Sequence, residues 1–224
     1  MPEQPKGRMR DAEATREAIL AAAEALFARD GFAGARIDAI AAASGYNKSL
    51  IFQYFGDKLG LYRAVVARMK EQTDTHLAQL IAPFVANDES ALDARQVRTL
   101  IEAAVTWTFD YYLARPNLVR ILAWEAAEGW RTFNMLETRQ GGGEWLVAVS
   151  SFTRRAQAAG LIHPDLDPIM MAITILGMIL HFHSSVARYQ RVFPRSNLTS
   201  AAALRHALEQ MVALVIHGAM VHTS

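Results

Sequence analysis

Apolar residues recur every three or four positions along most of the chain, which is the period of an amphipathic α-helix. The apolar side of the first such segment consists of Ile19, Ala23, Leu26 and Phe27. Gly31 follows as a C-terminal stop, because glycine readily takes the left-handed conformation that ends helices. No segment alternates apolar and polar residues as a half-buried strand would. The sequence therefore predicts an all-α fold.

Glycines, prolines and capping residues divide this pattern into nine predicted helices. They run over residues 12–31, 37–44, 48–55, 57 to about 80, 93–114, 117–128, 143–159, 168–191 and 199–220. Either Asp165 or Asp167 can cap the helix that starts at Pro168. Pro83 and the polar run 87–90 close the first section, and Gly141–Gly143 forms the main flexible break.

The most informative stretch runs from Ile37 to Phe55, where two short helices meet at Gly45. Ile40 and Ile51 fall on the sides that face the core and each other. Gly45 permits the sharp turn, and Asn47 is a suitable N-cap for the second helix. Two short helices joined in this way are what a helix-turn-helix requires.

The opposite side of the second helix is suited to a DNA major groove. Lys48 can donate to guanine or phosphate, Gln53 can pair with adenine, and Ser49 can serve either purpose. Leu50 and Phe52 can touch thymine methyl groups. A helical hairpin with a merely solvated face is the alternative interpretation.

Charge and cysteine content narrow the function classes. The formal net charge is +1, but residues 1–70 carry 11 Lys and Arg against 8 Asp and Glu, which favours DNA slightly. The chain has no cysteine, which excludes disulfides and thiolate chemistry. The most apolar run, Ile169 to Phe182, is too short to span a bilayer. We therefore expect a cytoplasmic protein with no membrane association.

The stretch from Thr15 to Leu61 resembles the DNA-binding domain of TetR-family repressors. The shared signature comprises Phe27, Gly31-Phe32, Ile40-Ala41, Gly45, the Phe52-to-Phe55 ending, Lys58 and Leu61. The later helices agree with the family in number, length and order. Residues 1–10 contain Pro, Gly and Arg without apolar periodicity, which predicts a flexible arm. The resemblance implies a helix-turn-helix domain over residues 11–56 and a ligand-binding and dimerisation domain over 57–224.

The resemblance also maps DNA contacts onto this chain. The predicted DNA-binding residues are Arg36, Asn47, Lys48, Ser49, Leu50, Phe52, Gln53, Tyr54 and Lys58. Three of them depart from the family pattern. Arg36 replaces a capping Ser or Thr but can bind phosphate, Phe52 replaces a tyrosine, and Leu50 replaces a Thr or Ser.

The family implies that the last two helices form a dimeric four-helix bundle. Both helices carry more apolar surface than one core can cover, which agrees with a partner copy. The predicted dimer residues are Ile173, Gly177, Leu180, Ser184, Leu204, Leu208, Met211 and Val215. A dimer would present two recognition helices to half-sites roughly 34–36 Å apart.

An apolar pocket with a few polar groups is expected in the large domain. The predicted ligand-binding residues are Trp107, Tyr111, Ile121, Leu122, Glu125, Met170, Thr174, Met178 and His181. Ordinary core packing is the alternative, with Glu125 paired to an arginine and His181 satisfied by a backbone carbonyl.

The sequence thus predicts a ligand-responsive repressor that binds a palindromic operator as a homodimer and needs no cofactor. Ligand would move the helix that begins at Asp57 and misalign the half-sites. A large domain that binds a protein partner remains an alternative. An enzyme or metal protein is disfavoured, because His181 and His183 are two apart and point apart on a helix.

Overall fold

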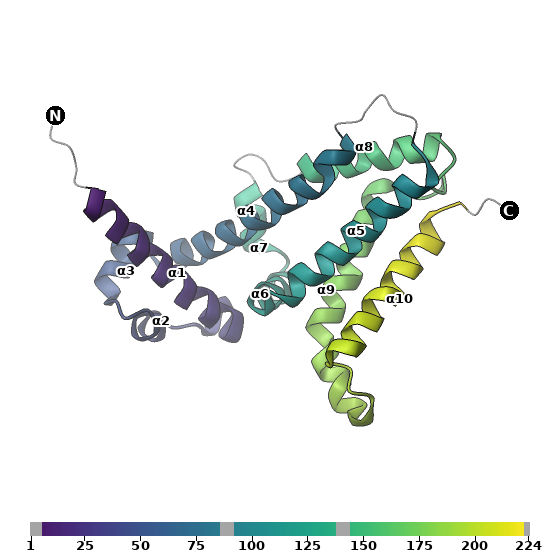
Figure 1. The fold of residues 1–224 in the computed structure, drawn as a ribbon. Helices are drawn as coiled ribbons and strands as arrows, with labels where there is room; N and C mark the ends of the chain where they lie inside the picture. The colour runs from purple at the N-terminus through teal and green to yellow at the C-terminus, as the bar shows by residue number, and fades with distance from the viewer. Residues whose placement is uncertain (1–5, 86–91, 138–143, 222–224) are drawn as a thin grey trace, which may run out of the picture. The chain divides into compact units, whose positions relative to one another are not determined.

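The computed structural model of the chain describes residues 6–85, 92–137 and 144–221 (Figure 1). Within these ranges the regular structure is helical, with one isolated bridge between Ile162 and Met220 and no strand. The predicted all-α fold is confirmed. The predicted break at Gly141–Gly143 lies outside the described residues.

The helices follow one another in the predicted order. Their bounds are α1 (Lys6–Gly34), α2 (Ile37–Ser44), α3 (Lys48–Phe55), α4 (Lys58–Val85), α5 (Ala94–Leu113), α6 (Pro116–Ala127), α7 (Arg131–Glu137), α8 (Glu144–Ala158), α9 (Pro168–Val192) and α10 (Ala201–Ala219), with a short 3-10 turn at Pro194–Ser196.

Three details of this order correct the sequence prediction. Residues 6–10, predicted as part of a flexible arm, are helical, and four of these five are Lys, Arg or Met, which are good helix formers. Helix α4 continues to Val85, past the predicted stop at Pro83. Helix α7 was not predicted, because seven residues are too few to display the helical period.

Contacts between residues divide the chain into two compact units. The N-terminal unit comprises Met1–Gln72 and Arg120–Gln140, and the C-terminal unit comprises Thr73–Val119 and Gly141–Ser224. Helices α4 and α6 contribute residues to both units. The two units are defined by contacts between residues. The predicted boundary after residue 56 instead separates two domains by their expected functions, and it stays a prediction.

The core of the N-terminal unit joins α1, α2, α3 and α4. Its fully buried side chains include Ile19, Leu20, Phe27, Ile40, Ile51, Leu61 and Val65. Phe27 and Tyr62 meet edge to face at 4.8 Å between ring centroids, and Phe32 lies 5.2 Å from Tyr62. Arg68 of α4 forms ion pairs with Glu17 and Glu24 of α1. The short helices α2 and α3 thus share one core with the longer helices α1 and α4.

A buried carboxylate ties α4, α6 and α7 together within the same unit. Glu125 is 1% exposed, and its Oε1 accepts a hydrogen bond of 2.8 Å from the Tyr62 hydroxyl. Its Oε2 accepts from the backbone N–H groups of Thr132 and Phe133 at 3.1 and 3.4 Å, which caps the first turn of α7. Burial, and then the hydrogen bond to Glu125, raise the pKa of the Tyr62 phenol, so that it stays a donor.

The C-terminal unit packs α5 against α9 and α10, and α8 against α9. Asp93 and Gln96 form a capping box at the start of α5, and Asp167 caps α9 through the N–H groups of Ile169 and Met170. The second of the two predicted caps is therefore confirmed. Phe109 is buried between α5 and α9, with its ring 4.5 Å from the His183 ring. Burial lowers the pKa of His183.

Gly60 occupies a position where the backbone of α4 closely approaches the end of α3. A Cβ atom there would lie 2.0 Å from the carbonyl oxygen of Phe55. We expect Gly60→Ala to lower the free energy of unfolding by about 1–3 kcal/mol or more, because the backbone must shift. Thermal or denaturant unfolding measures the change.

The matched control is Gly218→Ala in α10, where a Cβ would meet no atom within 4 Å. This variant should be neutral or stabilising by up to about 1 kcal/mol, because alanine favours helix. Equal effects of the two substitutions would contradict the close approach at Gly60.

Tyr62→Phe removes the hydroxyl that donates to Glu125 and leaves one carboxylate oxygen without its partner. We expect a loss of about 1–3 kcal/mol in the free energy of unfolding, the cost of a buried unsatisfied group. The control is Tyr112→Phe, because the Tyr112 hydroxyl makes no hydrogen bond within the described part of the chain and should matter less. A chevron or equilibrium denaturation series would compare the two variants.

Candidate nucleic-acid interface and internal cavity

The corner between α2 and α3 has the geometry of a helix-turn-helix. Gly45 takes φ 77° and ψ 8°, in the left-handed region, and its N–H donates to the Ala41 carbonyl at 3.1 Å. The Asn47 side chain accepts from the N–H of Leu50 at 2.9 Å. Both the predicted turn and the predicted N-cap are confirmed. Ile40 and Ile51 are fully buried, as expected from the pattern.

The outward side of α3 is exposed along its length. Lys48, Ser49, Phe52 and Gln53 are exposed, and Leu50 and Tyr54 are partly exposed. Phe52 is 42% exposed, although burial of a phenylalanine is favourable. An exposed aromatic ring beside an amide, a hydroxyl and an ammonium group forms a surface with both apolar and hydrogen-bonding capacity.

Lys48 is paired with an acidic residue, and one further basic residue, Arg36, is exposed at the start of α2. The Lys48 ammonium forms an ion pair with Asp38 of α2, and both side chains are at least half exposed. An exposed pair of this kind contributes only about 0–1 kcal/mol, so a phosphate can replace the aspartate. Arg36 stands at the N-cap position of α2, makes no capping hydrogen bond and is exposed. Its side chain is therefore available to solvent at the N-terminal end of α2.

Lys58 differs from the other predicted DNA contacts. Its ammonium donates to the Ala33 carbonyl at 3.1 Å and lies 4.9 Å from the centroid of the Phe32 ring. Both groups belong to the end of α1. These residues follow Gly31, whose backbone (φ 69°, ψ 174°) interrupts the helical conformation within α1, so Lys58 satisfies a carbonyl just after this kink. The predicted phosphate contact of Lys58 stays a prediction, and this residue also has a structural role.

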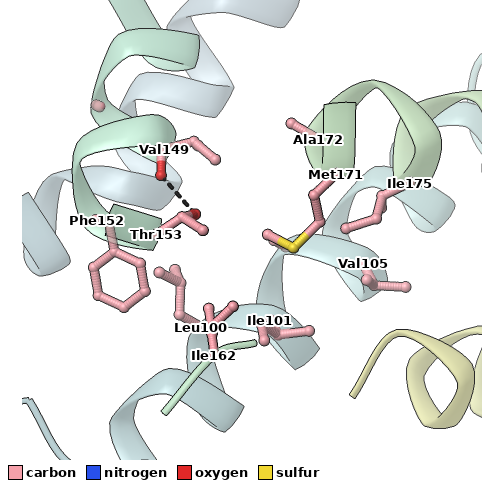
Figure 2. Close-up of a pocket in the computed structure, with 12 residues that line it drawn as sticks. Leu100, Ile101, Val105, Val149, Phe152, Thr153, Ile162, Met171, Ala172 and Ile175 are labelled. Atoms are coloured by element: carbon pink, nitrogen blue, oxygen red, sulfur yellow. Dashed lines mark hydrogen bonds between the residues drawn. The ribbon is translucent and has the colours of Figure 1, made fainter. Parts of the chain in front are cut away.

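An apolar cavity lies within the C-terminal unit, between α5, α8 and α9 (Figure 2). The residues that line it are Leu100, Ile101, Ala104, Val105, Ala148, Val149, Phe152, Thr153, Ile162, Met171, Ala172 and Ile175. The one hydroxyl in the wall, on Thr153, donates to the Val149 carbonyl at 2.8 Å. The cavity measures about 80 Å³ and offers almost no free polar group.

The predicted ligand-binding residues do not gather around this cavity. Trp107 and Tyr111 stack on each other at 4.8 Å on α5, with Arg115 over the Tyr111 ring. Ile121, Leu122 and Glu125 are buried in the N-terminal unit, where Tyr62 and two backbone N–H groups, not an arginine, bind the Glu125 carboxylate.

The remaining predicted ligand residues lie on the outer side of α9. Met170, Thr174 and Met178 line a surface groove between α9 and α10. His181 is exposed, and its carbonyl accepts from Ser184 and Ser185. The sequence prediction thus missed the residues of α8. The apolar spacing of Val149, Phe152 and Thr153 was the available signal for them.

The predicted dimer residues occupy a largely uncovered surface of the C-terminal unit. Ile173, Gly177 and Ser184 are exposed, whereas Met211 is buried. Leu180, Leu204, Leu208 and Val215 are partly exposed. Leu214 of α10, which was not predicted, is 66% exposed.

Helix α9 is unusually apolar for so exposed an element. Among the helices described, it is the one whose length and composition would suffice to cross a membrane, and 11% of its most apolar window is buried. The sequence prediction considered only Ile169 to Phe182, which is shorter than the helix that forms. Over the same described ranges, no group of three or more His, Asp or Glu side chains lies close enough to hold a metal ion.

Comparison with known proteins covers both parts of the chain. The family model of bacterial regulatory proteins of the tetR family matches residues 19–65. A second model, the tetracyclin repressor-like C-terminal domain, matches residues 98–215, which is more than half of the chain.

Individual relatives agree with these models. The HTH-type transcriptional repressor SCO4008 of Streptomyces coelicolor is 40% identical over 119 residues, which span 53% of this chain and 53% of that protein. The HTH-type transcriptional repressor NicS of Pseudomonas putida is 28% identical over 80% of this chain and 79% of its own length. The crystal structure of SCO4942 of Streptomyces coelicolor, described as a transcriptional regulator, is also similar. The match covers 92% of this chain and 98% of that chain, with 26% sequence identity and a TM-score of 0.62.

The helix-turn-helix corner and the later helices each match a model of the same family. The chain belongs to the TetR family of bacterial transcriptional regulators.

Proposed function

We propose that this regulator is a homodimeric repressor, acting in the cytoplasm, that binds a palindromic operator through α3 and is released by a small apolar effector. The observation that carries the proposal is the outward side of α3. An amide, a hydroxyl, an ammonium and an aromatic ring are exposed together on one short helix whose opposite side holds the fully buried Ile51. The relatives SCO4008 and NicS are named as repressors, which supports repression rather than activation of transcription.

In this proposal Lys48, Ser49 and Gln53 contact base edges, and Phe52 contacts a thymine methyl group. Arg36 and Tyr54 contact phosphates on either side and set the register of the helix. Lys48 would exchange its exposed pairing with Asp38 for a phosphate or guanine.

The effector is assigned by the chemistry of the cavity in the C-terminal unit. Its wall is aliphatic and aromatic, and the Thr153 hydroxyl is already engaged by a backbone carbonyl. Burying a charged group there would be costly, so the effector is expected to be neutral where it enters. Helix α4, which contributes residues to both units, is the covalent route by which occupancy would reach α3.

The dimer proposal rests on α9 and α10. An apolar helix with an exposed side is costly in water unless a second surface covers it. Its exposed residues include Ile173 at 52%, and glycine at 177 permits close approach of a second helix. The predicted two-fold arrangement would place the two α3 helices for adjacent half-sites.

Selection of bound DNA from a random duplex pool tests the proposal as a whole. A palindromic sequence should be enriched with the purified full chain. Recovery of no duplex, at low salt and with or without apolar compounds, would defeat it.

Lys48→Ala combined with Gln53→Ala should weaken binding to the selected operator while leaving binding to unrelated duplex DNA nearly unchanged. Each base contact is worth about 1–3 kcal/mol, so a loss of at least about tenfold in specific affinity is expected. Fluorescence anisotropy at one salt concentration measures both affinities. The control is Arg95→Ala on α5, an exposed basic residue of the C-terminal unit, which should leave them unchanged.

Ile173→Glu should convert the dimer to a monomer, because it places a charge in the proposed interface at a residue that is exposed in the single chain. The variant should fold normally and lose operator affinity. Analytical ultracentrifugation gives the mass. The matched control is Val147→Glu on α8, which is 70% exposed and lies outside α9 and α10, and which should remain dimeric. Dimerisation of the Ile173 variant would refute this interface.

A further inference from the structure

A polar hollow lies on the surface of the N-terminal unit, between α4 and α7. It measures about 670 Å³, which is within the range of about 300–1,000 Å³ that small-molecule sites occupy. The residues that line this α4–α7 hollow are Arg63 of α4, Glu128 and Gly129 of the turn after α6, and Arg131, Asn134 and Met135 of α7. All of them belong to one compact unit, so the hollow is distinct from the cavity and the groove of the C-terminal unit.

The two guanidinium groups of the hollow lack a strong hydrogen-bond acceptor. Arg63 is exposed, and its Nη2 donates to the Met135 sulfur at 3.1 Å, although a thioether is a weak acceptor. Arg131 is also exposed, and its side chain forms no hydrogen bond or ion pair within the described part of the chain. A guanidinium has five N–H donors in a planar fork that matches a carboxylate. Most donors of both side chains are therefore available to one.

The hollow also contains one carboxylate, on Glu128. Among the described residues Glu128 forms no ion pair with Arg63 or Arg131, although opposite charges attract and all three line the same space. Burial, the hydrogen bond to Glu125, and the charges of Glu125 and Glu128 raise the pKa of the Tyr62 phenol, so the Glu128 carboxylate lies on the side of the hollow near Tyr62. Two cations and one anion thus line one space without neutralising one another.

The turn between α6 and α7 brings two of these charges together. Gly129 and Trp130 in this turn take the left-handed backbone, with φ 73° and 61°. That conformation is an outlier for a residue as bulky as tryptophan, and strain of this kind is concentrated at functional sites. The Trp130 N–H donates to the backbone carbonyl of Glu125 at 2.7 Å, which holds the turn. Glu128 before the turn and Arg131 after it thereby line the same hollow.

We propose that the α4–α7 hollow binds a small zwitterion with the chemistry of a free α-amino acid. Its carboxylate accepts hydrogen bonds from the guanidinium groups of Arg63 and Arg131, and its ammonium group pairs with the Glu128 carboxylate. The Asn134 amide offers a further donor or acceptor, and Met135 lies beside the rest of the molecule. A simple anion would stand beside the like charge of Glu128, and a simple cation beside the arginines, so a molecule with both charges fits best.

Occupancy of the hollow joins α7 to α4 a second time. The first connection is the hydrogen bond network of Glu125, which accepts from Tyr62 of α4 and from the start of α7. Arg63 follows Tyr62 directly in α4. A molecule held by both Arg63 and Arg131 therefore binds the folded unit in preference to the unfolded chain and stabilises it by mass action. The inference goes beyond the proposed repressor function and needs neither an operator nor an apolar effector.

Thermal unfolding of the full chain with each of the twenty standard L-amino acids tests the proposal. At about ten times its Kd, an amino acid that fits should raise the Tm by roughly 3–6 °C. Two analogues of it, one without the α-amino group and one without the carboxylate, should each bind about tenfold more weakly or worse in isothermal titration calorimetry, because each loses one charged hydrogen bond. No rise in Tm with any of the twenty at about 10 mM, ten times a weak Kd of about 1 mM, would overturn the proposal.

Two substitutions separate a built site from solvated surface charges. Arg131→Gln should weaken binding of the amino acid about tenfold or more, and Glu128→Gln should do the same while binding the analogue without the α-amino group at least as tightly as before. Both residues are exposed, so neither variant should change the Tm of the chain alone by much. The matched control is Arg120→Gln, an exposed basic residue of α6 in the same unit that does not line the hollow. Unchanged affinity in either variant, or an equal loss in the control, would refute the assignment.

Discussion

The burial of two isoleucines determines what the N-terminal unit can do. Ile40 and Ile51 are both fully buried, and burying such a side chain is worth about 1.5–3 kcal/mol. With Ile51 turned inward, the orientation of the eight-residue helix α3 about its own axis is fixed. Lys48, Phe52 and Gln53 must then face outward. The same packing that stabilises the fold thereby exposes the side of α3 that we propose contacts DNA.

The C-terminal unit shows the opposite situation, in which apolar surface exceeds what one chain can bury. Helix α9 turns part of its apolar residues toward α5 and α8 and leaves the rest exposed. The cavity, the groove and the exposed side of α9 are three results of this excess. Each is a place where a second apolar surface lowers the free energy of the unit. An effector and a second copy of the chain are the two occupants that we propose for them.

Glu125 illustrates how an apolar helix side with one carboxylate can be misread. From the sequence, it has the character of a ligand-binding group on a pocket wall. In the fold it accepts hydrogen bonds from Tyr62, which is 63 residues away, and from the start of α7. A buried carboxylate needs such partners wherever they come from. Its role here is to join three helices of the N-terminal unit.

Local rules let the sequence alone determine the helices other than α7, the turn at Gly45, the cap at Asn47 and the inward and outward sides of α3, because each depends on nearby residues. The sequence could not show that α8 lines the cavity, that Lys58 binds a carbonyl of α1, or that Met171 lines both the cavity and the groove. Periodicity states which side of a helix is apolar but not which neighbour covers it. That choice is made by long-range packing, and only the tertiary structure decides it.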